Sequence, residues 1–300
     1  MTHQATAASA AFRALQDEIC AGLEALDGGG AFGEDLWERP GGGGGRSRTI
    51  EGAIIEKGGV GYSAVYGELS PLAAQALRTD GREFYATGVS IVLHPRNPHT
   101  PIIHMNVRYF ELEGGRWWFG GGIDLTPHYV DVALARDFHE RLHATCAAFP
   151  SCADYDLFKR QADEYFYLPH RRETRGVGGI FYDRLAAPDY PTLLAYSLAV
   201  GRTFVPAYAA QVAATRDLSF GESHQRWQGL RRGRYVEFNL AWDRGTKFGL
   251  ETDGRTESIL MSMPPQANWV YDHRPTADSP EARTLAWLRK GVDWLGDEAG

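Results

Sequence analysis

Cysteine and long apolar runs are scarce in this 300-residue sequence, and each scarcity excludes a class of protein. The three cysteines, Cys20, Cys146 and Cys152, form no C-x-x-C pair and no even framework, so we expect reduced thiols and no disulfide scaffold. The longest apolar run, 193–200, is far shorter than the ~20 residues that a membrane-spanning helix needs. No secretory signal is visible at the N-terminus. We therefore expect a soluble, cytoplasmic protein with no integral membrane segment.

Positive charge is also in short supply. The chain has 31 basic and 38 acidic residues, a net charge of −7, which argues against nucleic acid as a partner. Lysine is especially rare, since 27 of the basic residues are arginine. Codon bias explains such a ratio, but so does planar, bidentate recognition of carboxylates. The glycine clusters complete neither G-x-G-x-x-G nor G-x-x-x-x-G-K-[ST], so no bound nucleotide is expected.

The hydrophobic pattern predicts an α+β fold built as a single domain over residues 1–300, with a large, mostly antiparallel sheet. Short, β-branched and aromatic runs separated by turn residues fill 49–119. Further strands are expected at 234–242, 258–263 and 268–271. Helices are expected near 12–26, 131–147, 152–166, 189–215 and 280–295. The glycine-rich segment 38–46 is interpreted as a flexible loop, either a linker or a mobile flap over an active site.

Polar side chains share one face of an expected strand. The two-residue period of a strand sends His104, Asn106 and Arg108 to the same side, and Ser90 and His94 share a face on the strand before. A half-solvated sheet explains such a row. A binding site explains it as well, because arginine grips carboxylates, asparagine offers its amide and histidine moves protons near neutral pH.

Asp124 follows three consecutive glycines, 120–122, which allow a close approach of the backbone to another group. A turn with an Asx cap is the simple interpretation. If a ligand lies on the sheet, Asp124 is instead a candidate acceptor for ligand N–H groups or a general base.

The sequence His139-Glu140-Arg141-Leu142-His143 matches H-E-x-x-H on an expected helix, the signature of zinc proteases, with Glu164 as a possible third ligand. A zinc-dependent hydrolase is therefore an alternative function. The longer metzincin extension is absent, and five letters with two wildcards arise readily by chance. We favour a chance match, with His139 at the helix flank, Glu140 in solvent and only His143 near the site.

Two arginine clusters punctuate the second half of the chain. The simple interpretation is that both clusters are solvent-exposed patches. The alternative is that together they surround a polyanionic small molecule. Their members are Arg171, Arg172 and Arg175, and Arg231, Arg232 and Arg234.

Several long strings, in a fixed order from about residue 46 to 295, closely resemble oxygen-dependent coproporphyrinogen III oxidases. They include HMNVRYFE, WWFGGGIDLTPHY, LPHRRETRGVGGIFYD and GRYVEFNLAWDRGTKFGLETDGRTESILMSMPP. The resemblance implies a sheet sandwiched between helices. It also implies oxidative decarboxylation of two propionates of coproporphyrinogen III to vinyl groups in haem biosynthesis. The products are protoporphyrinogen IX and CO2, with O2 as electron acceptor and no organic cofactor.

The resemblance also assigns roles to residues. Asp124 would accept the pyrrole N–H groups and His104 would transfer a proton. Substrate would be bound by Ser90, Asn106, Val107 through its main chain, and Arg108, and by a second clamp of Asp253, Gly254 and Arg255. Relatives often carry glycine in place of Asp253, and a carboxylate beside a propionate repels it.

A divalent metal and a second copy of the chain are further expectations from the resemblance. The implied metal ligands are His94, His104, His143 and His170, and a homodimer interface is expected over Tyr235 to Tyr271. A tetrapyrrole-binding protein without catalysis is the remaining alternative. Such a protein would bind the porphyrinogen and release no CO2.

Overall fold

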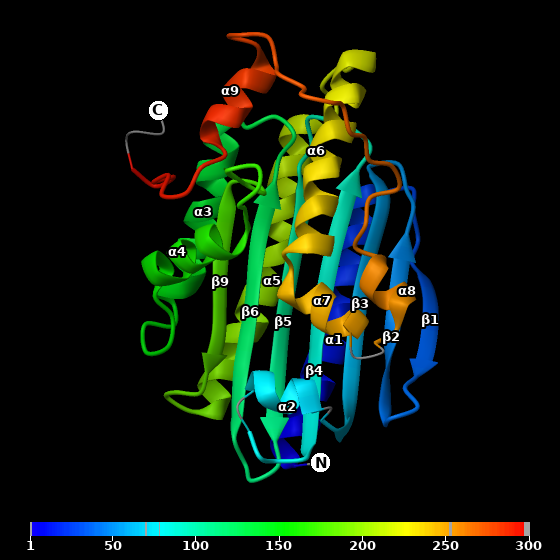
Figure 1. Cartoon of the computed structure of the whole chain (residues 1–300), viewed down its shortest axis with the longest axis vertical. Helices are drawn as coiled ribbons and strands as arrows, with labels where there is room; N and C mark the ends of the chain where they lie inside the picture. Colours follow the sequence, from blue (N-terminus) through cyan, green and yellow to red (C-terminus); the bar gives the residue numbers. More distant parts are fainter. Residues whose placement is uncertain (1, 70, 78, 252–253, 297–300) are drawn as a thin grey trace.

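A seven-stranded antiparallel sheet forms the centre of the molecule (Figure 1). The computed structural model describes residues 2–69, 71–77, 79–251 and 254–296. Neighbouring strands follow in the order β1-β2-β3-β4-β5-β6-β9, and β7 pairs only with β8. The bounds are β1 Gly33–Glu38, β2 Gly43–Ile50, β3 Ile55–Glu68, β4 Glu83–Pro95, β5 Ile102–Leu112, β6 Trp117–Thr126, β7 Tyr167–Leu168, β8 Glu173–Thr174 and β9 Gly178–Leu185. The expected antiparallel sheet is confirmed.

Two long helices cover one face of the sheet. They are α1 (His3–Asp27) and α5 (Tyr190–Thr215), which pack on each other and on the central strands. The apolar stripe predicted for the first helix is buried, and Gly28, in the left-handed conformation at φ 72°, ends the helix as expected. Because the strands alternate, this face receives the fully buried side chains of Met105, Val107 and Tyr109.

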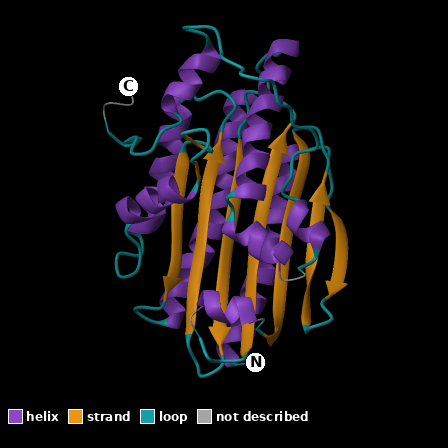
Figure 2. Cartoon of the chain, viewed as in Figure 1, coloured by secondary structure: helices purple, strands orange, loops and turns teal. Residues whose placement is uncertain are grey.

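The opposite face of the sheet lies under α6 (Glu222–Ala241), α7 (Arg244–Glu251) and α8 (Thr256–Leu260), as Figures 1 and 2 show. The sheet is therefore sandwiched between helices, as expected. Two further helices, α3 (Val132–Ala147) and α4 (Tyr155–Tyr165), contact β9. The short helices α2 (Pro71–Leu77) and α9 (Pro280–Trp287) complete the described elements.

The prediction of strands after residue 234 is wrong. Residues 234–241 belong to α6, 258–260 belong to α8, and 268–271 form neither helix nor strand. Aromatic and β-branched residues suggested strands, but α6 is buried on all sides over 227–233, and after that stretch Tyr235, Phe238 and Asn239 are buried at helical spacing. That spacing places them on one face of a helix, and packing on the sheet outweighs the local strand preference.

Two other boundaries differ from expectation. Residues 38–46 do not form a loop, because Glu38 and Gly43–Arg46 pair in the β1–β2 hairpin and only 39–42 make the turn. The last helix ends at Trp287 rather than near 295, although Val292 and Trp294 beyond it still pack into the core.

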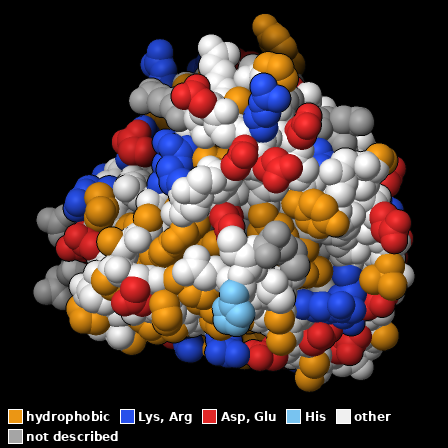
Figure 3. Space-filling model, turned by 90° about the horizontal axis from the view of Figure 1, so that it is seen from below, with side chains coloured by type: hydrophobic (Ala, Val, Ile, Leu, Met, Phe, Trp, Pro, Cys, Tyr) orange, Lys and Arg blue, Asp and Glu red, His pale blue; other side chains and the backbone are white. Residues whose placement is uncertain are grey.

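Charge is mixed over the surface that faces the lower end of the sheet. Acidic and basic side chains are interspersed with apolar ones there, and neither sign dominates that view (Figure 3). Among the described helices, none combines the length and the apolar character required to cross a bilayer.

Candidate active site

The predicted polar row lies on the face of the sheet beneath α6–α8. Antiparallel register aligns His104 with Val92 and Asp124, Asn106 with Ser90 and Gly122, and Arg108 with Gly88 and Gly120. The side chains of His104 and Arg108 keep 20% and 34% of their surface exposed, whereas Met105 and Val107 between them are fully buried on the other face. The sequence prediction of which residues share a face is confirmed.

His104 and Asp124 form the most buried polar pair of the row. His104 Nδ1 lies 2.7 Å from Asp124 Oδ1, and Asp124 is 1% exposed. We assign the Nδ1 proton to this bond, because an ionised carboxylate only accepts hydrogen bonds. In the tautomer with its proton on Nδ1, Nε2 is the nitrogen that can accept a proton.

Arg175 completes this group. The sequence analysis named it only as one member of an arginine cluster, and the interpretation of that cluster as a solvated patch is wrong for Arg175, which is 2% exposed. Its Nη2 donates to both carboxylate oxygens of Asp124 at 2.8 Å. Three aromatic rings surround the guanidinium, with Cζ 4.4 Å from the ring centre of Phe166, 4.8 Å from Tyr235 and 4.7 Å from Phe238. No local pattern distinguishes Arg175 from the exposed Arg171, so only the folded chain identifies it.

The charge of Arg175 keeps Asp124 ionised. Burial by itself would raise the pKa of Asp124, but the positive charge of Arg175 and the hydrogen bond from His104 outweigh burial and lower that pKa below its usual value. Both oxygens of Asp124 are engaged by these two partners. These contacts orient His104, and the role expected of Asp124 as an acceptor for ligand N–H groups stays a prediction.

Arg108, the outermost member of the row, pairs with a residue that lines an open cavity. It donates to Asn106 Oδ1 at 2.9 Å and to Asp183 Oδ1 at 2.7 Å. A Cβ on Gly120 would lie 2.7 Å from Asp183 Oδ1 and 2.8 Å from Arg108 Nη2, so only glycine leaves room for this pair. Asp183 also lines a cavity of about 710 Å³. Its other lining residues come from α4, from β7 and Pro169 after it, from β9, from the α6–α7 junction and from the segment after α9, with Arg160, Arg244 and Lys290 as its cations.

Ser90 is half-buried in the row, as expected, but Val107 does not fit its predicted role. The Val107 side chain is fully buried on the far face, and its main chain is paired with both neighbouring strands. A central strand has no free backbone group to offer a ligand, so the structure gives Val107 no contact on the polar face.

The second predicted clamp lies near the β1–β2 edge of the sheet. Arg255 contacts Asp35 in β1 and donates to Ser258 Oγ at 3.3 Å, and Ser258 in turn lies 2.9 Å from Ser47 Oγ in β2. Gly254 is half-buried next to Arg255, and Asp253 lies outside the described residues. Three strand spacings separate β2 from β5, roughly 14 Å, so Arg255 and His104 are far from contact.

The four histidines of the implied metal site do not form one site. His94 Nε2 lies 2.9 Å from the Ser262 carbonyl, His104 contacts Asp124, His143 is exposed on α3, and His170 contacts Glu237. Within the described residues, no three His, Cys, Asp or Glu side chains are grouped so as to hold a metal ion. The implied ligand set therefore does not fit a single metal centre in this chain.

The H-E-x-x-H match is not a zinc site. His139 is fully buried in the core rather than at the helix flank, with Nδ1 2.8 Å from Tyr155 Oη and Nε2 3.0 Å from the Val177 carbonyl. Glu140 and His143 are exposed, and His143 does not approach the polar row. Both nitrogens of His139 have protein partners, so the zinc-hydrolase alternative has no ligand pair here.

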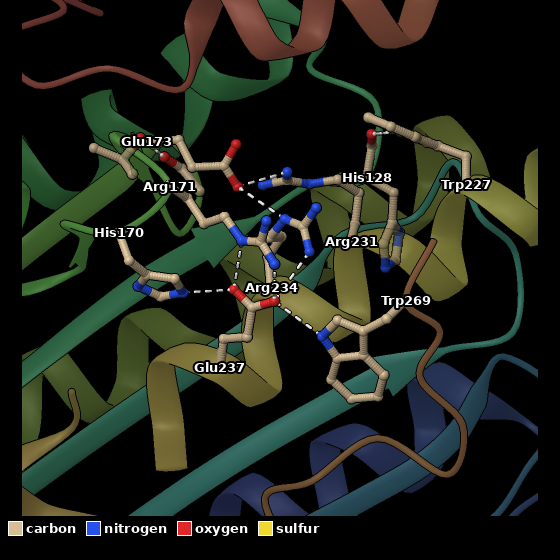
Figure 4. Close-up of polar contacts among 11 residues, drawn as sticks. His128, His170, Arg171, Glu173, Trp227, Arg231, Arg234, Glu237 and Trp269 are labelled. Carbon is tan, nitrogen blue, oxygen red and sulfur yellow. Dashed lines mark hydrogen bonds and ion pairs between the residues drawn. The ribbon is translucent and has the colours of Figure 1, made fainter. Parts of the chain in front are cut away.

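His170 belongs to a separate cluster centred on Glu237 of α6 (Figure 4). Glu237 accepts hydrogen bonds from His170 at 2.7 Å, Arg171 at 2.7 and 2.8 Å, Arg234 at 3.0 Å and Trp269 at 2.9 Å. Burial would raise the pKa of Glu237, but these donors lower it to about 2. Through these hydrogen bonds, Glu237 connects α6 both to the segment before β8 and to the segment around Trp269.

Comparison with known proteins places the chain among oxidases of one family. The family model described as "Coproporphyrinogen III oxidase" matches residues 7–294. A curated protein of Parasynechococcus marenigrum (strain WH8102), named oxygen-dependent coproporphyrinogen-III oxidase, is 49% identical over 312 aligned residues. The alignment covers 94% of this chain and 85% of that protein, so the similarity includes the whole polar row.

Proposed function

The chain belongs to the coproporphyrinogen III oxidase family, and we propose that the polar row from His104 to Arg108, with Asp124 and Arg175, is its active site. The enzyme oxidises coproporphyrinogen III with O2 in haem biosynthesis. Two propionates become vinyl groups as CO2 leaves, which yields protoporphyrinogen IX. The observation that carries the site assignment is the buried His104–Asp124–Arg175 group on the same sheet face as Arg108, whose partner Asp183 lines a cavity.

His104 is the proton-transferring residue in this proposal. Asp124 fixes the ring through Nδ1, so Nε2 is the nitrogen that accepts a proton and later returns it. The Asp124 carboxylate stabilises the imidazolium that forms, because opposite charges in a poorly solvated site attract strongly. Arg175 and its aromatic cage hold Asp124 in place and keep water away from its carboxylate.

Arg108 is the propionate clamp nearest to His104. Its guanidinium is partly exposed and fixed by Asn106 and Asp183, which orients the planar fork for a carboxylate. The adjoining cavity has a volume typical of small-molecule sites, and its cations Arg160, Arg244 and Lys290 suit the remaining propionates. Gly254 and Arg255 are proposed as the clamp for a distant propionate across the sheet.

The assembly and location of the enzyme are also proposals. We expect a homodimer through Tyr235–Tyr271. This segment does not form the strands expected of it, but it exposes large apolar side chains, among them Trp242, Trp269 and Tyr271. We expect a cytoplasmic enzyme that uses no organic cofactor. Light scattering at micromolar concentration tests the dimer, and a monomer contradicts it.

The decisive experiment mixes the purified protein with coproporphyrinogen III without oxygen and then admits air. We expect no product before air, and protoporphyrinogen IX with CO2 afterwards. Chromatography identifies the porphyrin product, and the amount of CO2 released is measured after it is trapped. Binding without CO2 release would instead support the non-catalytic tetrapyrrole-binding alternative, and a need for added flavin or nicotinamide would contradict the cofactor proposal.

A further inference from the structure

Asp183 is the carboxylate that meets Arg108 in the polar row. Arg108 Nη2 donates to Asp183 Oδ1 at 2.7 Å, and the Arg108 and Asp183 side chains keep 34% and 40% of their surface exposed. The other terminal nitrogen, Nη1, donates to Asn106 Oδ1 at 2.9 Å. Asn106 therefore orients the guanidinium, whereas Asp183 fills the position that a substrate carboxylate would take on it.

An irregularity in the sheet places Asp183 there. The pairing of β6 with β9 shifts between Phe119 and Gly121, so that two residues of β9, Asp183 and Arg184, stand opposite Gly120. A bulge of this kind redirects a side chain relative to its strand. Gly120 has no side chain, which leaves the space in which the carboxylate and the guanidinium meet. The fold therefore keeps room for one carboxylate on this guanidinium.

Asp183 also lines the cavity of about 710 Å³. Arg160 and Arg244 line the same cavity, and Arg244 Cζ lies 4.8 Å over the ring of Tyr165, another lining residue. A partly exposed ion pair is weak, so its partners can be exchanged at little cost. The Asp183 side chain can therefore turn from Arg108 into the cavity, where other positive charges compensate its own.

We propose that Asp183 is an internal competitor of the substrate carboxylate: it holds Arg108 in the free enzyme and yields Arg108 to a propionate when coproporphyrinogen III binds. The proposal rests on the proposed function, because it takes Arg108 as the propionate clamp. One carboxylate replaces another on the same donors, so Arg108 has a counter-charge in both states. The exchange also makes Arg108 selective. A small anion has to displace Asp183 through one contact, whereas the porphyrinogen adds the contacts of its other propionates.

The alternative is that Asp183 stays on Arg108 and only orients it. The two roles predict opposite effects of Asp183→Asn, which keeps the size of the side chain and removes its charge. A residue that only orients Arg108 is needed for binding, so its loss weakens the affinity for coproporphyrinogen III. Loss of a competitor strengthens the affinity, because no ion pair has to be broken and no like charge lies beside the propionate.

The experiment measures the dissociation constant, Kd, of coproporphyrinogen III without oxygen, from the tryptophan fluorescence of the full chain. Trp242 lines the cavity and serves as the reporter. We expect Asp183→Asn to lower Kd by at least about fivefold, and sodium propionate to displace the substrate at lower concentrations than in wild type. Asp183→Ala should shift Kd in the same direction, and in an Arg108→Gln background the gain should disappear. Urea unfolding verifies that each variant is folded.

Asp137→Asn is the matched control for the change in net charge. Asp137 pairs with Arg141 at 2.8 Å, and the two side chains are 36% and 38% exposed, but the pair lies on α3, which packs on α5. Its loss should leave Kd within about twofold of wild type, because salt screens charges that lie far from the ligand.

An unchanged or higher Kd in Asp183→Asn overturns the competitor role, as does an equal gain in Asp137→Asn. Failure of the proposed function has a different signature. A wild-type protein that binds coproporphyrinogen III but forms no product after air is admitted overturns the oxidase activity, and the comparison of Kd values still decides the role of Asp183.

Discussion

The two faces of the central sheet carry opposite residues on the same strands. On the α1–α5 side, Met105, Val107 and Tyr109 are fully buried and apolar contacts dominate. On the α6–α8 side, His104 and Arg108 remain partly exposed; His104 contacts Asp124 and Arg108 forms an ion pair with Asp183. Each strand therefore supports the core with one set of side chains and the chemistry with the other. Substitutions one position apart should separate stability from activity.

The largest effect is expected on the polar face, from Asp124→Asn. This change leaves the buried Arg175 without its counter-charge and releases His104, so turnover should fall by orders of magnitude. Loss of one partner from a buried ion pair costs about 3–5 kcal/mol of unfolding free energy, and the amide of asparagine should retain part of it. Turnover assays and urea unfolding measure both effects. Near-normal turnover would reduce Asp124 to a structural residue.

Met105→Ala should show the opposite behaviour on the apolar face. Removing a fully buried methionine side chain costs about 2–5 kcal/mol of unfolding free energy, because a cavity remains. The folded fraction should keep the kcat of wild type. His104→Ala, one residue earlier, is the matched comparison, with activity lost and about 1.5–3 kcal/mol of unfolding free energy lost with the hydrogen bond to Asp124. If both variants lose activity equally, the faces are not separable.

Arg108→Lys keeps the charge and removes the planar fork. Loss of one bidentate, charge-assisted contact should raise the activation free energy that corresponds to kcat/KM by about 1.5–3 kcal/mol. Stability should change by less than about 1 kcal/mol, because the Arg108–Asp183 pair is partly exposed. Steady-state kinetics with coproporphyrinogen III measure this loss. Wild-type kcat/KM in the lysine variant would exclude Arg108 as the propionate clamp.

Buried histidines should make stability depend on pH. Burial lowers the pKa of His94 and of His139 to about 3. Because these folded-state values lie below the unfolded value near 6.5, the unfolded chain binds more protons between about pH 6.5 and pH 3. Stability is therefore full above pH 6.5 and falls as pH decreases, by at most about 1.4 kcal/mol per pH unit for each histidine.

The check is urea unfolding of wild type and His139→Gln between pH 7 and pH 4. The variant should be less stable at pH 7, because His139 bridges Tyr155 and Val177. Its stability should also fall less steeply with decreasing pH. Equal slopes in the two proteins would contradict a neutral, buried His139.

The smallest effect is expected from Glu140→Ala. Glu140 is exposed on α3, away from the polar row, so both turnover and stability should remain close to wild type. A zinc hydrolase would lose its general base, typically a factor of ~10²–10⁴ in rate. Abolished turnover in a folded Glu140→Ala protein, checked by circular dichroism, would contradict the interpretation of this helix.

Local rules sufficed for much of the fold and part of the site. The two-residue period of a strand depends only on the backbone, so the shared face of His104, Asn106 and Arg108 could be predicted from their spacing. The first helix and its end at Gly28 followed from an apolar stripe and one glycine. The resemblance in sequence pointed to the family, and the family match agrees with it.

The folded chain alone decided which residues meet. Arg175 lies 51 positions from Asp124 and 71 from His104, and no local pattern sets it apart from its exposed neighbour Arg171. Residues 234–241 carry strand-forming side chains, yet burial of one helical face against the sheet makes them part of α6. Residue types and their periodicity can be read from a short stretch of sequence. Burial and ion pairing depend instead on contacts between distant segments, which form only when the chain packs.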